Sequence, residues 1–374
     1  MQEGVSLRID KIDVFHVAMP LIAPWKTSFS QETAIDSVLV RIQSGDLVGW
    51  GEAAPYAAPE FCAEWASGLF YLICDIFKPL LEGQDIEDAE TLQRMLSRFK
   101  GNQFAKAAID TAFWDLLAKS RNMPLWQMIG GKSATVKVGA DIPVQDSMEK
   151  LLSDVQKSVD AGFSRIKMKF RPDSGAGMVR SVREAFPEAV LHIDCNSGFS
   201  RDDLPLFREL DTLDLAMIEQ PLSSDDLLDH AWLQAQLETP ICLDESITSL
   251  HRARQAIDCG AARWINIKHG RVGGLTNALA IYALCIGRDV PCWIGGMLES
   301  CVGQGVSMAL ATLPSLAYAA DIFPEGRLYA KDMAEPPIHL SGPGEAKAPD
   351  RPGHGFAPNP ERLAACLIKV SERP

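Results

Sequence analysis

The chain has 374 residues, of which 47% are hydrophobic and 23% charged, a balance that excludes disordered and collagen-like classes. Its net charge of −13 argues against nucleic-acid binding, because that affinity rests on clustered lysine and arginine. The nine cysteines form no CxxC pair, the start does not resemble a signal peptide, and no apolar run reaches the roughly 18 residues of a membrane span. We therefore expect a cytoplasmic protein that acts on a small molecule, with no membrane or nucleic-acid partner.

The first third of the chain predicts a mixed domain. Residues 1–60 alternate in the manner of strands and turn through "QSGD" like a hairpin. From Glu60 to about Gly130, apolar residues recur at three and four positions, as in helices, and "MPLWQMIGG" closes the stretch. Strands followed by helices indicate an α+β domain over residues 1–130.

The middle of the chain, residues 131–320, alternates short apolar runs with amphipathic helices. The runs are "VKVGA", "RIKMKF", "VLHIDC", "LAMIEQ", "PICLDE", "RWINIK" and "VPCWIGG". A strand, a helix and two short loops together take roughly 25 residues. Repeats of that length indicate a parallel barrel or a doubly wound sheet. The Pro- and Gly-rich tail, residues 321–374, ends in the helix-like "ERLAACLIKV", and we expect it to pack back on the first domain.

Charged residues interrupt the apolar runs at their C-terminal ends. Lys169, Asp194, Glu219 and Asp244 follow one another at intervals of 25 residues, and Lys268 comes 24 residues later. In a (β/α) barrel the C-terminal ends of the strands form the active-site face. The regular spacing therefore predicts that five charged side chains converge on one mouth.

The three carboxylates, Asp194, Glu219 and Asp244, predict an all-oxygen site for a hard divalent cation, Mg²⁺ before Mn²⁺ or Ca²⁺. Lys169 lies beside them on the same strand face as Lys167. A desolvated lysine close to a second ammonium has a lowered pKa, so we predict that Lys169 is a general base and that Lys167 tunes it or holds a carboxylate. Removing a proton α to a carboxylate requires such a site, because negative charge builds up on the enolate.

Six segments together resemble a known family. They are "KMK", "DCN", "IEQPL", "LDES", "INIKHGRVGG" and "IGGMLES", and their order and spacing resemble the muconate lactonizing enzyme subgroup of the enolase superfamily. Within it, the chain is most similar to o-succinylbenzoate synthases and N-succinylamino acid racemases. The resemblance covers nearly the whole chain and implies a modified TIM barrel, (β/α)₇β, with an α+β capping domain. It also implies an assembly of at least two copies.

The resemblance assigns roles to individual residues. It implies that Asp194, Glu219 and Asp244 bind Mg²⁺, or Mn²⁺ in its place, and that Lys169 and Lys268 act on opposite faces of a carboxylate substrate. Asn196 and Glu245 would support the ligands. The segment "PWKTSF" resembles the mobile capping loop of the family and "GWGEAAP" its second capping loop. The implied substrate contacts are Trp25, Phe29, Gly296, Met297 and Ser300.

The chain also departs from its relatives. Racemase-competent relatives follow "MLES" with Gly, an aliphatic residue, Gly and Arg, whereas this chain has Cys301 to Gln304. The first barrel strand reads "VGADIPV" where many relatives have a Ser-Ile-Gly turn, and Phe323 stands where dipeptide epimerases carry a second aspartate after Asp321. The altered first strand indicates a changed substrate pocket, and Phe323 disfavours a dipeptide epimerase. Gln304 in place of Arg favours a Mg²⁺-dependent lyase, an o-succinylbenzoate synthase of menaquinone biosynthesis, over a racemase.

Three alternatives remain open. The first is an N-succinylamino acid racemase, which uses the same two lysines, and the second is a muconate-type cycloisomerase. The third is a non-catalytic binding protein with an enolase fold. The five interior charges argue against the last alternative, because a protein without catalytic activity gains nothing from burying them.

Overall fold

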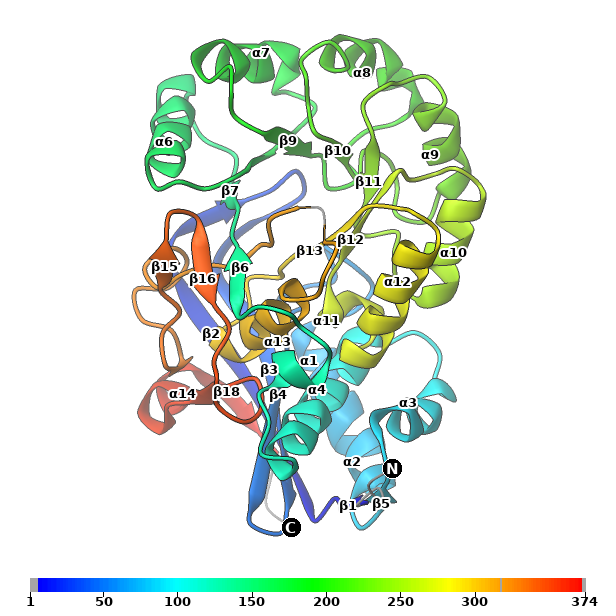
Figure 1. The fold of residues 1–374 in the computed structure, drawn as a ribbon, viewed down its shortest axis with the longest axis vertical. Helices are drawn as coiled ribbons and strands as arrows, with labels where there is room; N and C mark the ends of the chain where they lie inside the picture. Colours follow the sequence, from blue (N-terminus) through cyan, green and yellow to red (C-terminus); the bar gives the residue numbers. More distant parts are fainter. Residues whose placement is uncertain (1–5, 317, 372–374) are drawn as a thin grey trace.

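The computed structural model describes residues 6–316 and 318–371. It consists of a ring of strands and helices beside a smaller lobe made by the N-terminal part of the chain (Figure 1). Buried apolar side chains form one continuous core through both parts. In the described part of the chain, no helix is long and apolar enough to cross a membrane.

Seven parallel strands form the ring, in the order in which they follow along the chain. They are β7 (Ala140–Ile142), β8 (Ile166–Lys169), β9 (Leu191–Asp194), β10 (Ile218–Glu219), β11 (Ile241–Leu243), β12 (Trp264–Ile267) and β13 (Cys292–Ile294). Two hydrogen bonds close the ring where an eighth strand is expected: Asp321 N donates to Ile294 O (2.9 Å) and Ala320 N to Lys137 O (2.9 Å). The predicted (β/α)₇β barrel is confirmed.

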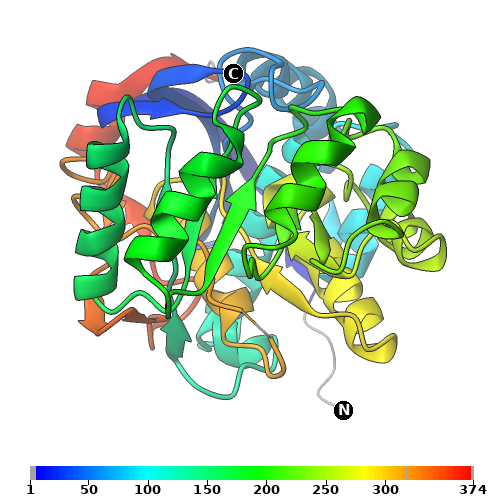
Figure 2. The same ribbon diagram turned by 90° about the horizontal axis from the view of Figure 1, so that it is seen from above.

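Helices cover the outside of this curved sheet (Figure 2). They are α6 (Met148–Asp160), α7 (Gly175–Ala185), the short η2 (Arg201–Asp203) with α8 (Leu204–Leu210), α9 (Leu227–Gln234), α10 (Leu250–Asp258), α11 (His269–Val272), α12 (Leu275–Gly287) and α13 (Cys301–Ala311). Helix α6 is typical: Ser147 caps its first turn, and the helix buries one apolar side against the strands. The longer helices return the chain to the end of the ring where the next strand begins, which brings all the strand C-termini to one mouth.

The smaller lobe is an antiparallel sheet covered by helices. The sheet contains β18 (Leu367–Val370), β2 (Lys11–Lys26), β3 (Gln31–Ser44) and β4 (Leu47–Ala53), in that order. The helices are α1 (Ala66–Leu72), the π-helical turn η1 (Ile73–Phe77), α2 (Lys78–Leu81), α3 (Ala89–Ser97), α4 (Gln103–Ser120) and α5 (Leu125–Met128). The short strands β1 (Leu7–Arg8) and β5 (Asp85–Ile86) pair beside them. The predicted hairpin at "QSGD" is confirmed by the turn between β3 and β4.

Two glycines of β4 let α4 lie directly on the sheet. A Cβ atom added at Gly49 would lie 2.1 Å from the carbonyl oxygen of Ala112, and one at Gly51 2.3 Å from that of Ala108. Any larger residue would therefore push the helix away from the strand. This close packing fixes the position of the segment after β4, which reaches the barrel mouth.

The tail crosses from the barrel to the cap. Strand β14 (Ala334–Glu335) pairs with β17 (Ala357–Pro358), and β15 (Leu340–Gly342) and β16 (Glu345–Lys347) extend β6 (Thr135–Lys137). Helix α14 (Pro360–Cys366) is shorter than the helix-like end predicts, because the chain then becomes β18 and pairs antiparallel with β2. Figure 1 shows this last segment, in red, beside the blue strands of the cap. The domain limits at residues 130 and 320 stay a prediction, and residues 1–5 and 372–374 lie outside the described part.

Candidate active site

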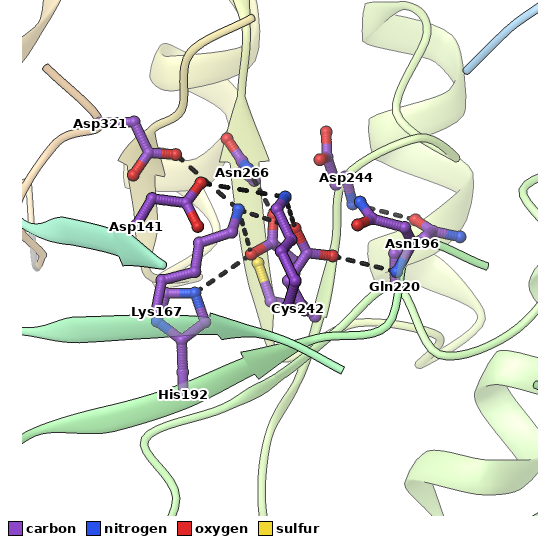
Figure 3. A network of polar contacts seen from close by, with 12 residues as sticks. Asp141, Lys167, His192, Asn196, Gln220, Cys242, Asp244, Asn266 and Asp321 are labelled. Carbon is purple, nitrogen blue, oxygen red and sulfur yellow. Dashed lines mark hydrogen bonds and ion pairs between the residues drawn. The ribbon is translucent and has the colours of Figure 1, made fainter. Parts of the chain in front are cut away.

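The five charged residues predicted from their spacing lie at one end of the barrel. Lys169, Asp194 and Glu219 are the last residues of β8, β9 and β10, while Asp244 and Lys268 directly follow β11 and β12. The strand register pairs Asp194 with both Lys169 and Glu219. All five side chains are buried. Figure 3 shows how side chains from these neighbouring strand ends point toward one another.

The three carboxylates meet closely enough to share one cation. One oxygen each from Asp194, Glu219 and Asp244 lie within 4.8 Å of one another. Two further oxygens in this region, Asn196 Oδ1 and Glu245 Oε2, are buried without a hydrogen-bond partner. Unpaired buried oxygens are costly unless a ligand satisfies them. The donor set, made only of oxygen, thus fits a hard divalent cation.

Basic side chains compensate the charge of the triad. Lys167 Nζ lies 2.9 Å from Asp194 Oδ2 and 2.9 Å from Glu219 Oε2. Lys169 Nζ lies 2.7 Å from Asp194 Oδ2, and Lys268 Nζ lies 2.8 Å from Asp244 Oδ2. Arg271 pairs with the other oxygen of Asp244, Oδ1. The two candidate bases thus approach the triad through different carboxylates.

The pKa values of this network follow from charge pairing. Burial alone would raise the pKa of Glu219, but the Lys167 ammonium holds it well below its ordinary value. Burial alone would lower the pKa of Lys167, but Asp194 and Glu219 hold it well above its ordinary value. Lys167 thus holds two carboxylates, as one of its two predicted roles requires, whereas its effect on Lys169 stays a prediction.

Three further residues position the triad, and the charge spacing did not reveal them. Gln220 Oε1 accepts hydrogen bonds from the backbone N–H groups of Asp244 (3.0 Å) and Ser246 (3.1 Å). Asn266 Nδ2 donates to Glu219 Oε1 (2.7 Å), and His192 Nε2 lies 3.2 Å from Glu219 Oε2. Asn266 and His192 each stand two positions before a predicted site residue, so strand alternation places them on the inner face.

Asp141 adds an unpredicted acid to the site. It lies on β7, opposite Lys167 in the strand register, and its side chain is 5% exposed. Its Oδ2 lies 3.8 Å from Lys169 Nζ, and its Oδ1 has no hydrogen-bond partner. Burial raises the pKa of Asp141 despite the nearby lysines. Its distance of 28 residues from Lys169 breaks the 25-residue spacing, although it interrupts an apolar run as the other charges do.

The cap covers the mouth of the barrel. Trp25 packs edge to face on Phe323, with ring centroids 6.0 Å apart, and Ser28 Oγ donates to the carbonyl oxygen of Asn196 (3.1 Å). Phe29, the other predicted aromatic contact, is half-buried. On the far side, Lys268 Nζ lies 5.2 Å from the ring centroid of Phe61. A cleft of about 240 Å³ reaches Lys169 from outside the barrel.

The predicted contacts from "GGMLES" divide into two groups. Met297 Sδ lies 3.7 Å from Lys268 Nζ, and Gly296 packs against the backbone at Asp321. Ser300 instead contacts Glu52, because its backbone N–H donates to Oε1 (3.0 Å) and its hydroxyl to Oε2 (2.5 Å). A contact between Ser300 and a substrate stays a prediction.

Glu52 joins the cap to the start of α13. Besides Ser300, its carboxylate accepts hydrogen bonds from Gly303 N (3.0 Å) and from Ser37 Oγ (2.8 Å). Burial raises the pKa of Glu52 to about 7. One turn along α13, Gln304 Nε2 donates to the carbonyl oxygen of Glu299 (3.0 Å) and its Oε1 accepts from Phe323 N (2.7 Å). Gln304 thus supports the aromatic wall of the site.

Comparison with known proteins gives a consistent result. Residues 10–130 match the mandelate racemase / muconate lactonizing enzyme N-terminal domain, and residues 150–362 match the enolase C-terminal domain-like family. An N-succinylamino acid racemase from Thermus thermophilus is 40% identical over 88% of this chain and 89% of its own length. An o-succinylbenzoate synthase from Geobacillus stearothermophilus is 39% identical over 94% of each chain.

Solved structures extend the similarity to the fold. An enolase superfamily member from Listeria innocua superimposes with a TM-score of 0.93 at 36% identity, covering 97% of this chain and 98% of its own. A muconate lactonizing enzyme from Pseudomonas fluorescens, complexed with muconolactone, gives a TM-score of 0.91 at 25% identity, covering 96% and 99%.

Proposed function

The chain belongs to the mandelate racemase / muconate lactonizing enzyme family of the enolase superfamily, and we propose that it is an o-succinylbenzoate synthase. Such an enzyme abstracts the proton α to a carboxylate and dehydrates a cyclohexadiene carboxylate. The observation that carries this proposal is the pair of buried lysines, Lys169 and Lys268, that contact different members of one carboxylate triad. Curated o-succinylbenzoate synthases that are 39% and 34% identical over nearly the whole chain support it.

The triad is the proposed metal site. Asp194, Glu219 and Asp244 would hold Mg²⁺, or Mn²⁺ in its place, and Asn196 with Glu245 would support them. When bound, the cation neutralises the negative charge that builds on the substrate carboxylate as the α-proton leaves. Lys167 keeps two of these carboxylates ionised and in place.

The two lysines have different proposed tasks. Neutral Lys169 takes the α-proton, the C–H electron pair forms a double bond, and the C–O bond to the neighbouring hydroxyl breaks. The proton and the departing hydroxide together make up the water that is released. Lys268 lies on the other side and offers its positive charge to the ring face of the substrate. Trp25, Phe29 and Met297 keep water away from this region.

A racemase acting on N-succinylamino acids is the second candidate. It is favoured by the two-sided arrangement of Lys169 and Lys268, because one lysine can remove the α-proton while the other returns it to the opposite face. The Thermus relative, named as such a racemase, supports it. Gln304, where racemase-competent relatives carry Arg, makes the lyase our first choice.

The setting of the enzyme is part of the proposal. All nine cysteines are free in the structure, which supports a reducing cytoplasm. An assembly of two or more copies stays a prediction.

The experiment follows the ultraviolet absorbance of 2-succinyl-6-hydroxy-2,4-cyclohexadiene-1-carboxylate in the presence of Mg²⁺. We expect turnover by the wild type and a loss of about 10³-fold or more in both Lys169→Ala and Lys268→Ala. Lys169→Arg is the matched control, because it keeps the positive charge but cannot act as a base at neutral pH. Turnover that survives Lys169→Ala would show that another group is the base.

A further inference from the structure

The proposed substrate carries two carboxylates, and the cation of the triad would bind only the one beside the reacting carbon. The other ends the succinyl side chain. None of the predicted substrate contacts has a positive charge; they are Trp25, Phe29, Gly296, Met297 and Ser300. A carboxylate that enters a covered site without a positive partner is costly to desolvate. The site therefore needs a further cationic group for the distal carboxylate.

Arg171 lies on the inner side of the chain just beyond Lys169. The chain stays extended past the end of β8, because Phe170 N donates to the carbonyl oxygen of Asp194 (2.8 Å). Side chains alternate along an extended chain, so Arg171 faces the same way as Lys169. Phe170, between them, packs against Phe199 with ring centroids 5.5 Å apart. Arg171 thus stands one step nearer to solvent than the proposed base.

The cleft of about 240 Å³ that reaches Lys169 is also lined by Arg171. Residues 143–148, which follow β7, form its opposite wall. The backbone of Arg171 is held in place by Ser174, because Arg171 N donates to Ser174 Oγ (3.2 Å) and Ser174 N donates to the carbonyl oxygen of Arg171 (2.9 Å). The cleft therefore connects the proposed base to a cation that is anchored at its rim.

The guanidinium of Arg171 is incompletely paired. Among the described residues, its buried Nε has no hydrogen-bond partner. Asp173 Oδ1 lies 3.2 Å from Nε without the alignment of a hydrogen bond, while Oδ2 accepts one from Nη2 (3.3 Å). The side chain of Asp173 is 71% exposed, so water competes for it and this ion pair is weak. Two parallel N–H groups of Arg171 can thus turn to a carboxylate on a ligand.

We propose that Arg171 is a specificity-determining residue whose guanidinium binds the carboxylate at the end of the succinyl side chain. This inference rests on the proposed function, because Lys169 sets the position of the reacting carbon. Lysine and arginine side chains are of similar length, so their charged ends are separated by about two strand residues, roughly 6–7 Å. Five bonds separate the reacting carbon from the distal carboxyl carbon, which is about 6 Å when the side chain is extended.

The position of Arg171 decides which kinetic constant it controls. Its charge would meet a part of the substrate that does not change during dehydration, so it stabilises the bound substrate and the transition state equally. Loss of such a contact raises KM and leaves kcat unchanged. A carboxylate without a distal acid gains nothing from Arg171, so the residue selects substrates with two acidic ends.

The test compares two ligands that differ only at the distal end. They are o-succinylbenzoate, the product of the proposed reaction, and its analogue with a primary amide in place of the distal carboxylate. Calorimetry measures the Kd of each for the Mg²⁺-loaded enzyme. We expect Arg171→Gln to weaken binding of o-succinylbenzoate about 10- to 100-fold, and binding of the amide less than about fivefold. In turnover of the cyclohexadiene, KM should rise to a similar degree while kcat stays within about twofold.

Two further variants separate this contact from a structural role. Asp173→Asn removes the competing acid, so it should tighten binding of o-succinylbenzoate about two- to fivefold, whereas a purely structural ion pair predicts weaker binding. Arg171→Lys keeps the charge without the fork and should lie between Arg171→Gln and the wild type. Arg180→Gln is the matched control, because Arg180 is exposed and pairs with Glu209 outside the cleft. It should leave both Kd values unchanged, and thermal melting checks that all variants are folded.

The outcomes distinguish this inference from the proposed function. Equal losses for both ligands in Arg171→Gln would overturn the role of Arg171, and so would weaker binding in Asp173→Asn. A wild type that still dehydrates the cyclohexadiene in those cases would leave the proposed synthase intact. A wild type that neither dehydrates the cyclohexadiene nor binds o-succinylbenzoate would overturn the proposed function, and the inference with it.

Discussion

Two groups of buried carboxylates lie within this molecule, and they are stabilised in different ways. At the barrel mouth, Asp194, Glu219 and Asp244 are surrounded by three lysines and an arginine. At the junction of cap and barrel, Glu52 accepts hydrogen bonds from N–H and O–H donors, and the nearby Glu299 raises its pKa further. Among the described residues, Glu299 has only His269 within ion-pair distance (3.7 Å). The pKa of Glu219 is accordingly held low, while burial raises that of Glu52 to about 7.

The comparison separates burial from charge compensation. Both groups are buried, yet the pKa values of Asp194 and Glu219 are held below their ordinary values, because basic side chains were buried with them. A region that must attract a cation needs that compensation when the cation is absent. A region that only joins two parts of the chain can leave its carboxyl group close to neutral.

The largest expected change in unfolding free energy comes from removing a charge of the triad, which tests directly whether its pairing with buried lysines stabilises the fold. Glu219→Gln removes one of the two carboxylates that hold Lys167, so in a chelator we expect a loss of about 3 kcal/mol of unfolding free energy in urea. Added Mg²⁺ should then stabilise the wild type more than the variant. An unchanged stability would mean that repulsion between Glu219 and Asp194 outweighs the pairing with Lys167.

The second prediction concerns pH at the junction. Because the pKa of Glu52 is about 7 in the folded protein and near 4.5 in the unfolded chain, the folded state binds more protons between these values. The contribution of Glu52 to the unfolding free energy is therefore fully present below pH 4.5 and is lost as the pH rises through 7. The loss is on the order of 2–3 kcal/mol.

Comparison with Glu52→Gln isolates this contribution. The pKa of His269 is lowered by burial to about 4, which makes stability rise between pH 4 and 6.5, but this effect is common to both proteins. The stability difference between wild type and Glu52→Gln should thus fall as pH rises from 5 to 7.5. A difference that does not change with pH would contradict the raised pKa of Glu52.

A smaller effect is expected at Ser300, whose hydroxyl donates a hydrogen bond to Glu52. Ser300→Ala removes the hydrogen bond to Glu52 and the side-chain cap of α13, which together predict a loss of about 1–2 kcal/mol in urea unfolding. If the hydroxyl only joins cap and barrel, KM for the substrate should stay within about twofold. A large rise in KM with little change in stability would instead favour the predicted substrate contact.

The smallest effect is expected at the surface. Glu209 accepts a hydrogen bond from Arg180 (2.8 Å), and these side chains are 51% and 45% exposed. Since water already solvates both charges, Glu209→Gln should change the unfolding free energy by less than about 0.5 kcal/mol. The Glu→Gln substitution is thus made at buried Glu219, which pairs with Lys167, and at exposed Glu209. If Glu209→Gln lowered the unfolding free energy as much as Glu219→Gln, burial would not be the reason for the difference expected between the two sites.

The sequence predicts the barrel mouth better than it predicts the junction. Strand ends recur at nearly constant chain distance, so the five charges could be found by counting. Asp141 escapes that count because it lies opposite Lys167 in the strand register and not at the level of Lys169, so its chain distance to Lys169 is 28 residues and not 25. Glu52 and Ser300 are 248 residues apart, and no local pattern connects them.

Tertiary pairing also overrode a local pattern at the C-terminus. The segment "ERLAACLIKV" has helical periodicity throughout, but its last four residues form β18, because the edge of β2 offers them backbone partners. A strand of this length is stable only beside a longer one, so its presence cannot be read from the segment alone.

The pairing of β18 with β2 has a consequence for the order in which the protein is made. Val370 pairs with Phe15, so the edge of the cap sheet stays open until the chain has been synthesised as far as residue 370. During synthesis the barrel strands emerge after β2 but before β18, and until β18 follows, the uncovered edge of β2 is free to pair with other nascent chains. Completion of the cap is therefore tied to the synthesis of β18, and a chain that stops before Leu367 would leave that edge exposed.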